Sequence, residues 1–206
     1  MTQPSISLSQ DQIDFFHREG YLALPAITSA AEVIRLQAIY DRIFATKAGR
    51  AEGDHLDLVT SDDDEAAEQL PQILNPSKYA PELIDTLFRA NATAIARQLL
   101  GSEARFTGDH AIRKAPNSGV ETPWHQDEAY WDPDKEYNSL SIWIPLQEAT
   151  LENGCMHFVP RSQERDVLPH HPIGNDPAVI GLEADDVAAW VQQVVTCPLP
   201  AGGATI

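Results

Sequence analysis

The chain has 206 residues, of which 43% are hydrophobic and 22% are charged, a composition typical of a globular domain with one sizeable core. Its formal net charge of −17 argues against a function in binding nucleic acid or anionic lipid, because a negatively charged surface repels both. No apolar run approaches membrane-spanning length, and the N-terminus MTQPSISLSQ lacks the basic region and apolar core of a signal peptide. With Cys155 and Cys197 expected as reduced thiols, these features predict a cytoplasmic protein without nucleic-acid or membrane partners.

Capping patterns predict helices in the first half of the chain. An S-x-x-Q box at Ser9 predicts a helix that ends at Gly20, and YLALPAI after it is expected as a short strand. An S-x-x-E box at Ser29 predicts a second helix that ends at Gly49, with apolar residues spaced for one buried stripe. A third helical region is expected over residues 81–100. Residues 50–66, which include the run SDDDE, are expected as a solvated acidic loop.

From residue 104 the hydrophobic period changes to that of strands. Residues 104–114 and 139–147 alternate, and in SLSIWIPLQ the apolar face carries Leu140, Ile142, Ile144 and Leu146, while the other face carries Ser141, Trp143 and Pro145. A turn at ENGC, a strand at MHFVP, and an insert over 163–190 with a short helix near 184–191 follow. A last strand is expected in CPLPAGGATI.

This order of elements predicts one α+β domain over residues 1–206. Its helical part is expected over 1–103, with the helices packed on one sheet, and its antiparallel sheets over 104–206 are expected to form a sandwich or barrel. The given sequence ends at Ile206, within the segment ATI, which is typical of the beginning of a strand. An unpaired strand edge at residues 204–206 would favour self-association or low stability.

The stretch TPWHQDEAYW is the candidate for chemistry. His125 and Asp127 are two residues apart, and in a strand such residues point to the same side. Imidazole with carboxylate suits Fe(II), Mn(II) or Zn(II). Pro123 favours an extended entry to the pair. Tyr130 and Trp131 could wall a substrate pocket, and a purely structural packing role for both is an equal alternative.

Four segments together resemble the phytanoyl-CoA dioxygenase family: FFHREGYLALP, WHQDEAYW, SLSIWIPLQ and ENGCMHFVPRS. The resemblance implies a double-stranded β-helix (a cupin-like jelly roll) and an Fe(II)- and 2-oxoglutarate-dependent dioxygenase that uses O2 to hydroxylate a small-molecule substrate at a C–H bond. It implies that His125 and Asp127 bind the metal and act in catalysis. It places Trp143, His110 and, more loosely, Gln72 beside 2-oxoglutarate. A plain core or cavity histidine is the alternative for His110, and ordinary core packing is the alternative for Trp143. The presence of Asp127 favours hydroxylation over halogenation.

The chain departs from this family at its end. The distal metal histidine and the arginine that pairs with 2-oxoglutarate follow a strand like PLPAGGATI in the family, and neither is present before Ile206, so the last strands are expected to be missing. An inactive jelly-roll remnant or a small-ligand binding module is therefore an alternative function, and a zinc hydrolase or cupin-like isomerase is another. His157, His170 and His171 are candidates for a substitute ligand. The simpler interpretations are a packed or surface strand role for the first and exposed-loop roles for the other two, and a substrate-channel role is favoured over ligation.

Overall fold

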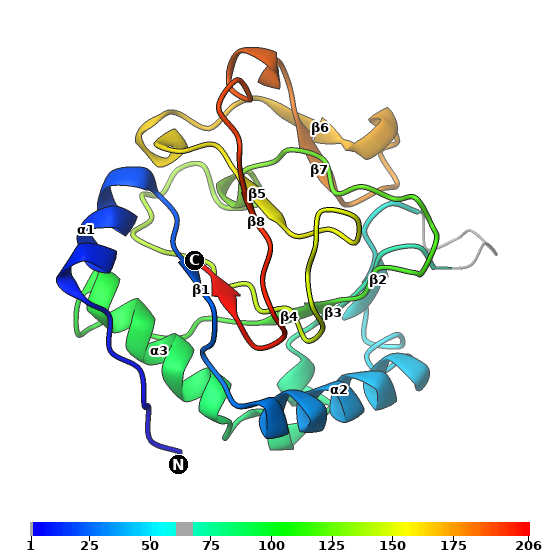
Figure 1. Ribbon diagram of the computed structural model, residues 1–206. Helices are drawn as coiled ribbons and strands as arrows, with labels where there is room; N and C mark the ends of the chain where they lie inside the picture. Colours follow the sequence, from blue (N-terminus) through cyan, green and yellow to red (C-terminus); the bar gives the residue numbers. More distant parts are fainter. Residues whose placement is uncertain (1, 61–67) are drawn as a thin grey trace.

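The computed structural model describes residues 2–60 and 68–206. Its α-helices are α1 (Gln10–Glu19), α2 (Ala30–Ala45) and α3 (Leu87–Leu100). They lie along the outside, and the strands occupy the middle and the opposite end of the molecule (Figure 1). Short 3-10 helices are found at Pro76–Lys78, Pro81–Leu83, Asp127–Tyr130, Ser162–Glu164, Ile173–Asn175 and Val187–Ala189. None of the described helices combines the length and the apolar character that a bilayer crossing needs.

The strands are short and pair antiparallel. The pairs are β1 (Ala23–Leu24) with β9 (Ala204–Thr205), β2 (His55–Asp57) with β3 (Pro71–Leu74), β3 with β4 (His110–Ile112), β5 (Met156–Phe158) with β8 (Val195–Cys197), and β6 (His170–Pro172) with β7 (Leu182–Ala184). The α+β class is confirmed, while the described strands form four small sheets and no closed barrel. The β1–β9 and β3–β4 pairings both join segments on opposite sides of the predicted 103/104 boundary.

Helix α1 begins and ends where its sequence predicts. Ser9 Oγ accepts the N–H of Gln12 at 3.2 Å, and Gln12 Oε1 accepts the N–H of Ser9 at 2.9 Å, so the predicted capping box is complete. Gly20 ends the helix with φ of 80°, a left-handed conformation that glycine adopts without strain. Both signals are local, which explains why the sequence alone suffices here.

The second capping box is only half formed. Ser29 caps α2, but the carboxylate of Glu32 accepts hydrogen bonds from Thr28 Oγ1 at 2.6 Å and from the backbone N–H groups of Leu87 at 3.0 Å and Phe88 at 2.7 Å. Those two N–H groups belong to the first turn of α3 and have no partner within that helix. Glu32 therefore caps α3 and joins it to α2, because the positive end of a helix dipole attracts a carboxylate.

Replacing Glu32 with Ala is expected to lower the free energy of unfolding by about 2 kcal/mol, since it removes a cap and leaves two helix N–H groups without a partner. Burial raises the pKa of Glu32, but the donors around it outweigh burial and hold that pKa below its usual range. Denaturant titration would measure the loss. Glu82→Ala is the matched control, because the Arg42–Glu82 ion pair is exposed and should contribute little to stability.

The core has two clusters that place the predicted apolar face of residues 139–147 inside. Leu140, Ile142 and Ile144 pack on a cluster built from α3, β1 and β9, and Leu146 packs on a second cluster built mainly from α2. This face is confirmed. The segment is nevertheless not a regular strand, because its ladder is reduced to one bridge between Trp143 and Thr205.

The expected unpaired edge at residues 204–206 is wrong. Thr205 exchanges both backbone hydrogen bonds with Trp143, at 2.9 and 3.0 Å, and β9 pairs with β1 on its other side. Ile206 exchanges both backbone hydrogen bonds with Leu22, at 2.9 and 3.0 Å, and is 6% exposed. Segments from much earlier in the chain thus cover both edges of β9, and the argument for self-association through this edge no longer holds.

Three further expectations need correction. Residues 50–66 are not wholly a solvated loop, because His55 and Asp57 in β2 are buried. The run SDDDE lies outside the described residues. The insert over 163–190 contains the β6–β7 ribbon, and the short helix near 184–191 is a single 3-10 turn. The third helical region starts as a 3-10 turn, with α3 itself beginning at Leu87. Both cysteines are free and buried.

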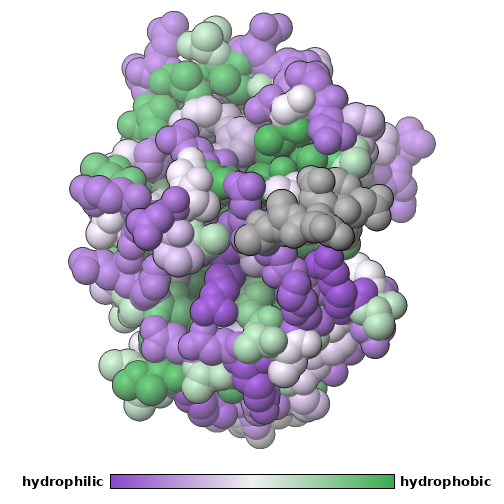
Figure 2. Space-filling model, turned by 90° about the vertical axis from the view of Figure 1, so that its right-hand side faces the viewer, coloured by the Kyte–Doolittle hydropathy of each residue, from purple (hydrophilic) through white to green (hydrophobic). Residues whose placement is uncertain are grey.

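The surface shows the mixture of polar and apolar residues that the composition of a globular domain predicts. Hydrophilic residues cover most of the face shown in Figure 2, and hydrophobic patches are scattered between them.

Candidate metal and substrate site

His125 and Asp127 come together without a strand. No strand is assigned to this segment, and Asp127 opens the 3-10 helix Asp127–Tyr130, so the predicted strand is wrong. Gln126 between them is extended, with φ of −117° and ψ of 126°, and this single residue is enough to turn both neighbours to one side. His125 Nε2 lies 3.5 Å from Asp127 Oδ1.

The hydrogen bonds of His125 select the tautomer that can bind a metal. Its Nδ1 lies 2.9 Å from the carbonyl oxygen of Pro123, which can only accept, so Nδ1 carries the proton. The lone pair of Nε2 then faces Asp127. Asp127 raises the pKa of His125 against the opposing effect of burial, and His125 in turn holds the pKa of Asp127 below its usual range. The raised pKa reflects a proton on Nε2 that faces the ionised carboxylate, and an Fe(II) ion held by these two groups would take the place of that proton.

Ser141 is a member of the site that the sequence interpretation missed. Its hydroxyl donates to Asp127 Oδ2 at 2.6 Å, which contributes to the low pKa of Asp127 and leaves Oδ1 toward His125. The signal was present, because Ser141 precedes Trp143 by two residues on the same face of SLSIWIPLQ. Trp143 itself is half-buried and held by its backbone pairing with Thr205.

Gln72 and His110 meet across neighbouring strands. Gln72 in β3 is 8% exposed, and its Oε1 lies 2.9 Å from Nδ1 of His110 in β4. Nδ1 of His110 donates to this oxygen, and the ring lies near enough to Asp127 that a positive charge on it lowers the pKa of that carboxyl. The structure thus joins two of the three residues predicted for 2-oxoglutarate and brings His110 near Asp127.

A third metal ligand is not found in the described ranges, where no three side chains of His, Cys, Asp and Glu are grouped to hold a metal. His157 is exposed on β5, which favours the surface role over the packed one, and it makes a ring contact with Trp124 at 6.3 Å between centroids. His170 and His171 are not in an exposed loop, because both lie in β6 and are half-buried.

His171 lies between two carboxylates of the ribbon. Its Nδ1 is 2.6 Å from Asp185 and its Nε2 is 2.7 Å from Glu183. Asp185, more than Glu183, raises the pKa of His171 above its usual value. The three side chains therefore form one ionic cluster on the face of the β6–β7 ribbon.

The stability that this cluster gives the ribbon should depend on pH in a defined direction. A raised pKa means that the contribution is complete below the pKa of an unfolded histidine, about 6.5, and is lost as pH rises through the folded value. An NMR titration of the His171 ring should give a pKa above that reference, and Asp185→Asn should bring it down. A ring that titrates at the reference value in both proteins would contradict the geometry.

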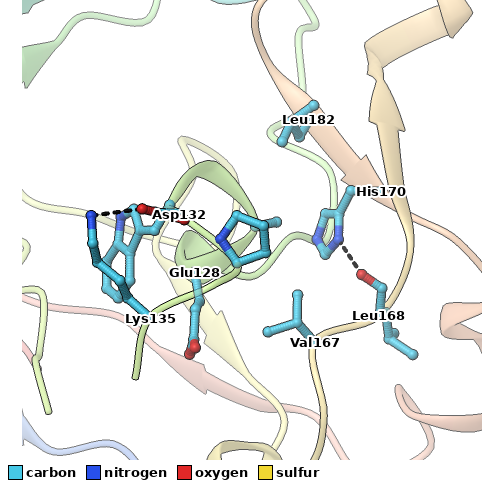
Figure 3. A pocket seen from close by; sticks show the side chains of 10 residues that line it. Glu128, Asp132, Lys135, Val167, Leu168, His170 and Leu182 are labelled. Atoms are coloured by element: carbon cyan, nitrogen blue, oxygen red, sulfur yellow. Dashed lines mark hydrogen bonds and ion pairs between the residues drawn. The ribbon is translucent and has the colours of Figure 1, made fainter. Parts of the chain in front are cut away.

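A cavity of about 400 Å³ lies between the Asp127–Tyr130 turn and the β6–β7 ribbon. Its walls are Glu128, Ala129, Trp131, Asp132, Pro133, Lys135, Val167, Leu168, His170 and Leu182. Figure 3 shows Asp132 and Lys135 on one side and His170 with Leu182 on the other. Lys135 is the one cation of this lining, and it pairs with Asp132 at 2.6 Å.

Of the two aromatic residues predicted for a substrate pocket, Trp131 lines this cavity. Tyr130 is not part of the lining, and its hydroxyl accepts the N–H of Leu182 at 2.7 Å. Its ring makes an edge contact with His125 at 6.5 Å between centroids. Tyr130 therefore connects the His125–Asp127 pair to the ribbon.

The sequence profile of a family described as Phytanoyl-CoA dioxygenase (PhyH) matches residues 16–206. A phytanoyl-CoA dioxygenase of Arabidopsis thaliana is 26% identical over 79% of this chain and 67% of its own length. An ectoine dioxygenase of Sphingopyxis alaskensis is 28% identical over 75% of this chain and 50% of its own length.

The crystal structure of EvdO2 from Micromonospora carbonacea var. aurantiaca, complexed with 2-oxoglutarate, is similar to this chain with a TM-score of 0.78 and 38% sequence identity. The match covers 99% of this chain and 82% of EvdO2. The resemblance of the sequence motifs to this group of oxygenases is thereby confirmed over almost the whole chain.

Proposed function

The chain belongs to the phytanoyl-CoA dioxygenase family, and on that premise we propose that it is an Fe(II)- and 2-oxoglutarate-dependent dioxygenase that hydroxylates a small molecule at a C–H bond. Iron(II), 2-oxoglutarate and O2 are the cofactor and cosubstrates of this kind of oxygenase. One observation carries the proposal: His125 Nε2 and Asp127 Oδ1 face each other at 3.5 Å, with the proton of His125 fixed on the far nitrogen. Relatives and structural neighbours that are oxygenases favour the enzyme over a ligand-binding remnant.

The chain's own residues would each have a defined part. His125 and Asp127 would hold the metal, with Pro123 fixing the imidazole tautomer and Ser141 orienting the carboxylate. When bound, iron supplies the oxidising chemistry that couples conversion of 2-oxoglutarate and O2 into succinate and CO2 to hydroxylation of the substrate.

The groups proposed for 2-oxoglutarate are Gln72, His110 and Trp143. Gln72 would act through His110, because its side-chain oxygen accepts the hydrogen bond from Nδ1 and fixes the ring. In the imidazolium form, Nε2 would then donate to an oxygen of 2-oxoglutarate, which offers only acceptors. Trp143 is held half-buried by Thr205, two residues from the serine that orients Asp127. A rigid indole at that position would exclude water from the cosubstrate.

The cavity beside the Asp127–Tyr130 turn is the proposed substrate pocket, with Trp131 in its wall and Tyr130 between it and His125. Glu128 and Asp132 give it two carboxylates, and Lys135 is already paired with Asp132. Such a lining favours neutral or cationic small molecules over phosphate-rich ones such as coenzyme A esters.

The experiment that tests the proposal measures succinate formed from 2-oxoglutarate by the Fe(II)-loaded protein, with a panel of neutral and cationic small molecules. Turnover above the uncoupled background should require O2 and should disappear in His125→Ala. Product formation that continues without O2 would instead identify a hydrolase or isomerase on the same fold. Succinate formation that is equal in His125→Ala and the parent would exclude the proposed site.

A further inference from the structure

The metal pair is held in place by a ribbon that comes later in the chain. Since the segment around His125 has no strand of its own, its geometry must be fixed from outside. Two hydrogen bonds connect it to β7: the N–H of Ala184 donates to the carbonyl of Trp124 at 2.8 Å, and the N–H of Leu182 donates to the Tyr130 hydroxyl at 2.7 Å. These bonds flank the pair on either side.

The residue between the two proposed ligands is held by β6. The backbone N–H of Gln126 donates to Nε2 of His170 at 3.1 Å. The side chain of Gln126 adds a second link, because its Oε1 accepts the N–H of Leu168 at 2.8 Å. Rotation about φ and ψ of Gln126 would swing His125 and Asp127 apart, and these hydrogen bonds oppose that rotation.

His170 is suited to this task by its own hydrogen bonds. Its Nδ1 lies 2.7 Å from the carbonyl of Leu168, so Nδ1 donates and Nε2 is left as an acceptor for Gln126. Both ring nitrogens are thus satisfied in one neutral tautomer. The same ring forms part of the cavity wall, opposite Asp132 and Lys135 (Figure 3).

We infer that His170 is a positioning residue for the metal site: through the backbone of Gln126 it sets the relation between His125 and Asp127, and it links that relation to the wall of the substrate cavity. The inference rests on the proposed function, because it takes His125 and Asp127 as the metal ligands. Outer partners of metal ligands commonly contribute ten- to a hundredfold in affinity, and His170 acts in this way on the backbone between two of them.

The test compares Mn(II) binding in the parent and in three variants. Binding is measured as the loss of the EPR signal of free Mn(II). His170→Phe keeps a ring but offers no acceptor, and should raise the Kd for Mn(II) by about tenfold or more. His170→Gln restores an acceptor near the position of Nε2 and should return the Kd toward the parent value. His171→Phe makes the same change one residue along the ribbon, away from Gln126, and should leave the Kd unchanged.

Hydrogen exchange of the Gln126 amide gives a second readout that does not depend on metal or activity. The amide should exchange slowly in the parent and in His171→Phe, and faster in His170→Phe. If His170→Phe does not fold, Gln126→Leu removes the link to Leu168 at the same point and should weaken Mn(II) binding in the same direction.

The outcomes separate the two claims. A parent that binds Mn(II) no better than His125→Ala would contradict the proposed function itself. A parent that binds well, with His125→Ala defective and His170→Phe equal to the parent in both Kd and amide exchange, would overturn the role of His170 alone. Equal weakening by His170→Phe and His171→Phe would mean that the whole ribbon matters and His170 does not act through Gln126.

Discussion

Replacing Asp57 with Ala should lower the free energy of unfolding by about 3 kcal/mol or more. Asp57 is 4% exposed, and its carboxylate accepts four backbone N–H groups, from Val59 and Thr60 at 3.0 Å and from Gln69 and Leu70 at 2.7 and 2.9 Å. These donors lie on the two sides of one connection, so a single side chain ties its ends together. Without the carboxylate, the inward-facing donors lose their partner.

Chemical denaturation at neutral pH would measure this loss, with Asp41→Ala as the control. Asp41 carries the same side chain, 67% exposed and paired with Arg113 at 2.8 Å, and its removal should cost about 0.5 kcal/mol or less. An Asp57→Ala protein as stable as the control variant would show that the four hydrogen bonds contribute little.

The contribution of Asp57 to stability should also depend on pH. Burial raises the pKa of Asp57, but the four N–H donors outweigh burial and hold the pKa below its usual range. A lowered pKa gives stability that is present above the unfolded value, about 3.9, and is lost as pH falls through the folded value. The difference between the parent and Asp57→Ala should therefore be constant near neutral pH and shrink in strong acid.

Replacing Asp127 with Ala should raise the Kd for Mn(II) by more than about a hundredfold, equivalent to about 2.7 kcal/mol, because it removes one of two protein donors rather than a partner of a donor. It also leaves His125 Nε2 without the carboxylate that faces it at 3.5 Å. Calorimetric titration with Mn(II) would measure the change.

Asp134→Ala is the matched control for this experiment, since it deletes the same side chain seven residues further along in an exposed segment. It should bind Mn(II) as the parent does. Comparable losses in both variants would point to a general effect of charge on a protein of net charge −17, and not to a ligand at Asp127.

The features that the sequence predicts well depend on neighbouring residues. The cap at Ser9, the stop at Gly20 and the buried face of Leu140, Ile142 and Ile144 all follow from local spacing, and all are confirmed. The family follows from motifs that are contiguous in the chain, such as WHQDEAYW, and it is confirmed as well.

The features that were missed depend on residues far apart in the chain. Glu32 caps α3 across 55 positions, and His170 holds Gln126 across 44, so neither partner is visible in local spacing. The edge of β9 was expected to be open because its partners, β1 and Trp143, come earlier in the chain. His125 and Asp127 face the same side because Gln126 between them is extended, which is the expected reason. This one residue is not part of a strand, and the segment is held by the β6–β7 ribbon.

The measurement that tests the account most directly is calorimetric titration of the parent protein with 2-oxoglutarate, with and without Mn(II). If His125 and Asp127 hold the metal and 2-oxoglutarate binds through it, 2-oxoglutarate should bind in the presence of Mn(II), and should bind little in its absence or to His125→Ala with Mn(II) present. Binding that is the same with and without Mn(II), or that survives in His125→Ala, would contradict the assignment of this pair as the metal centre.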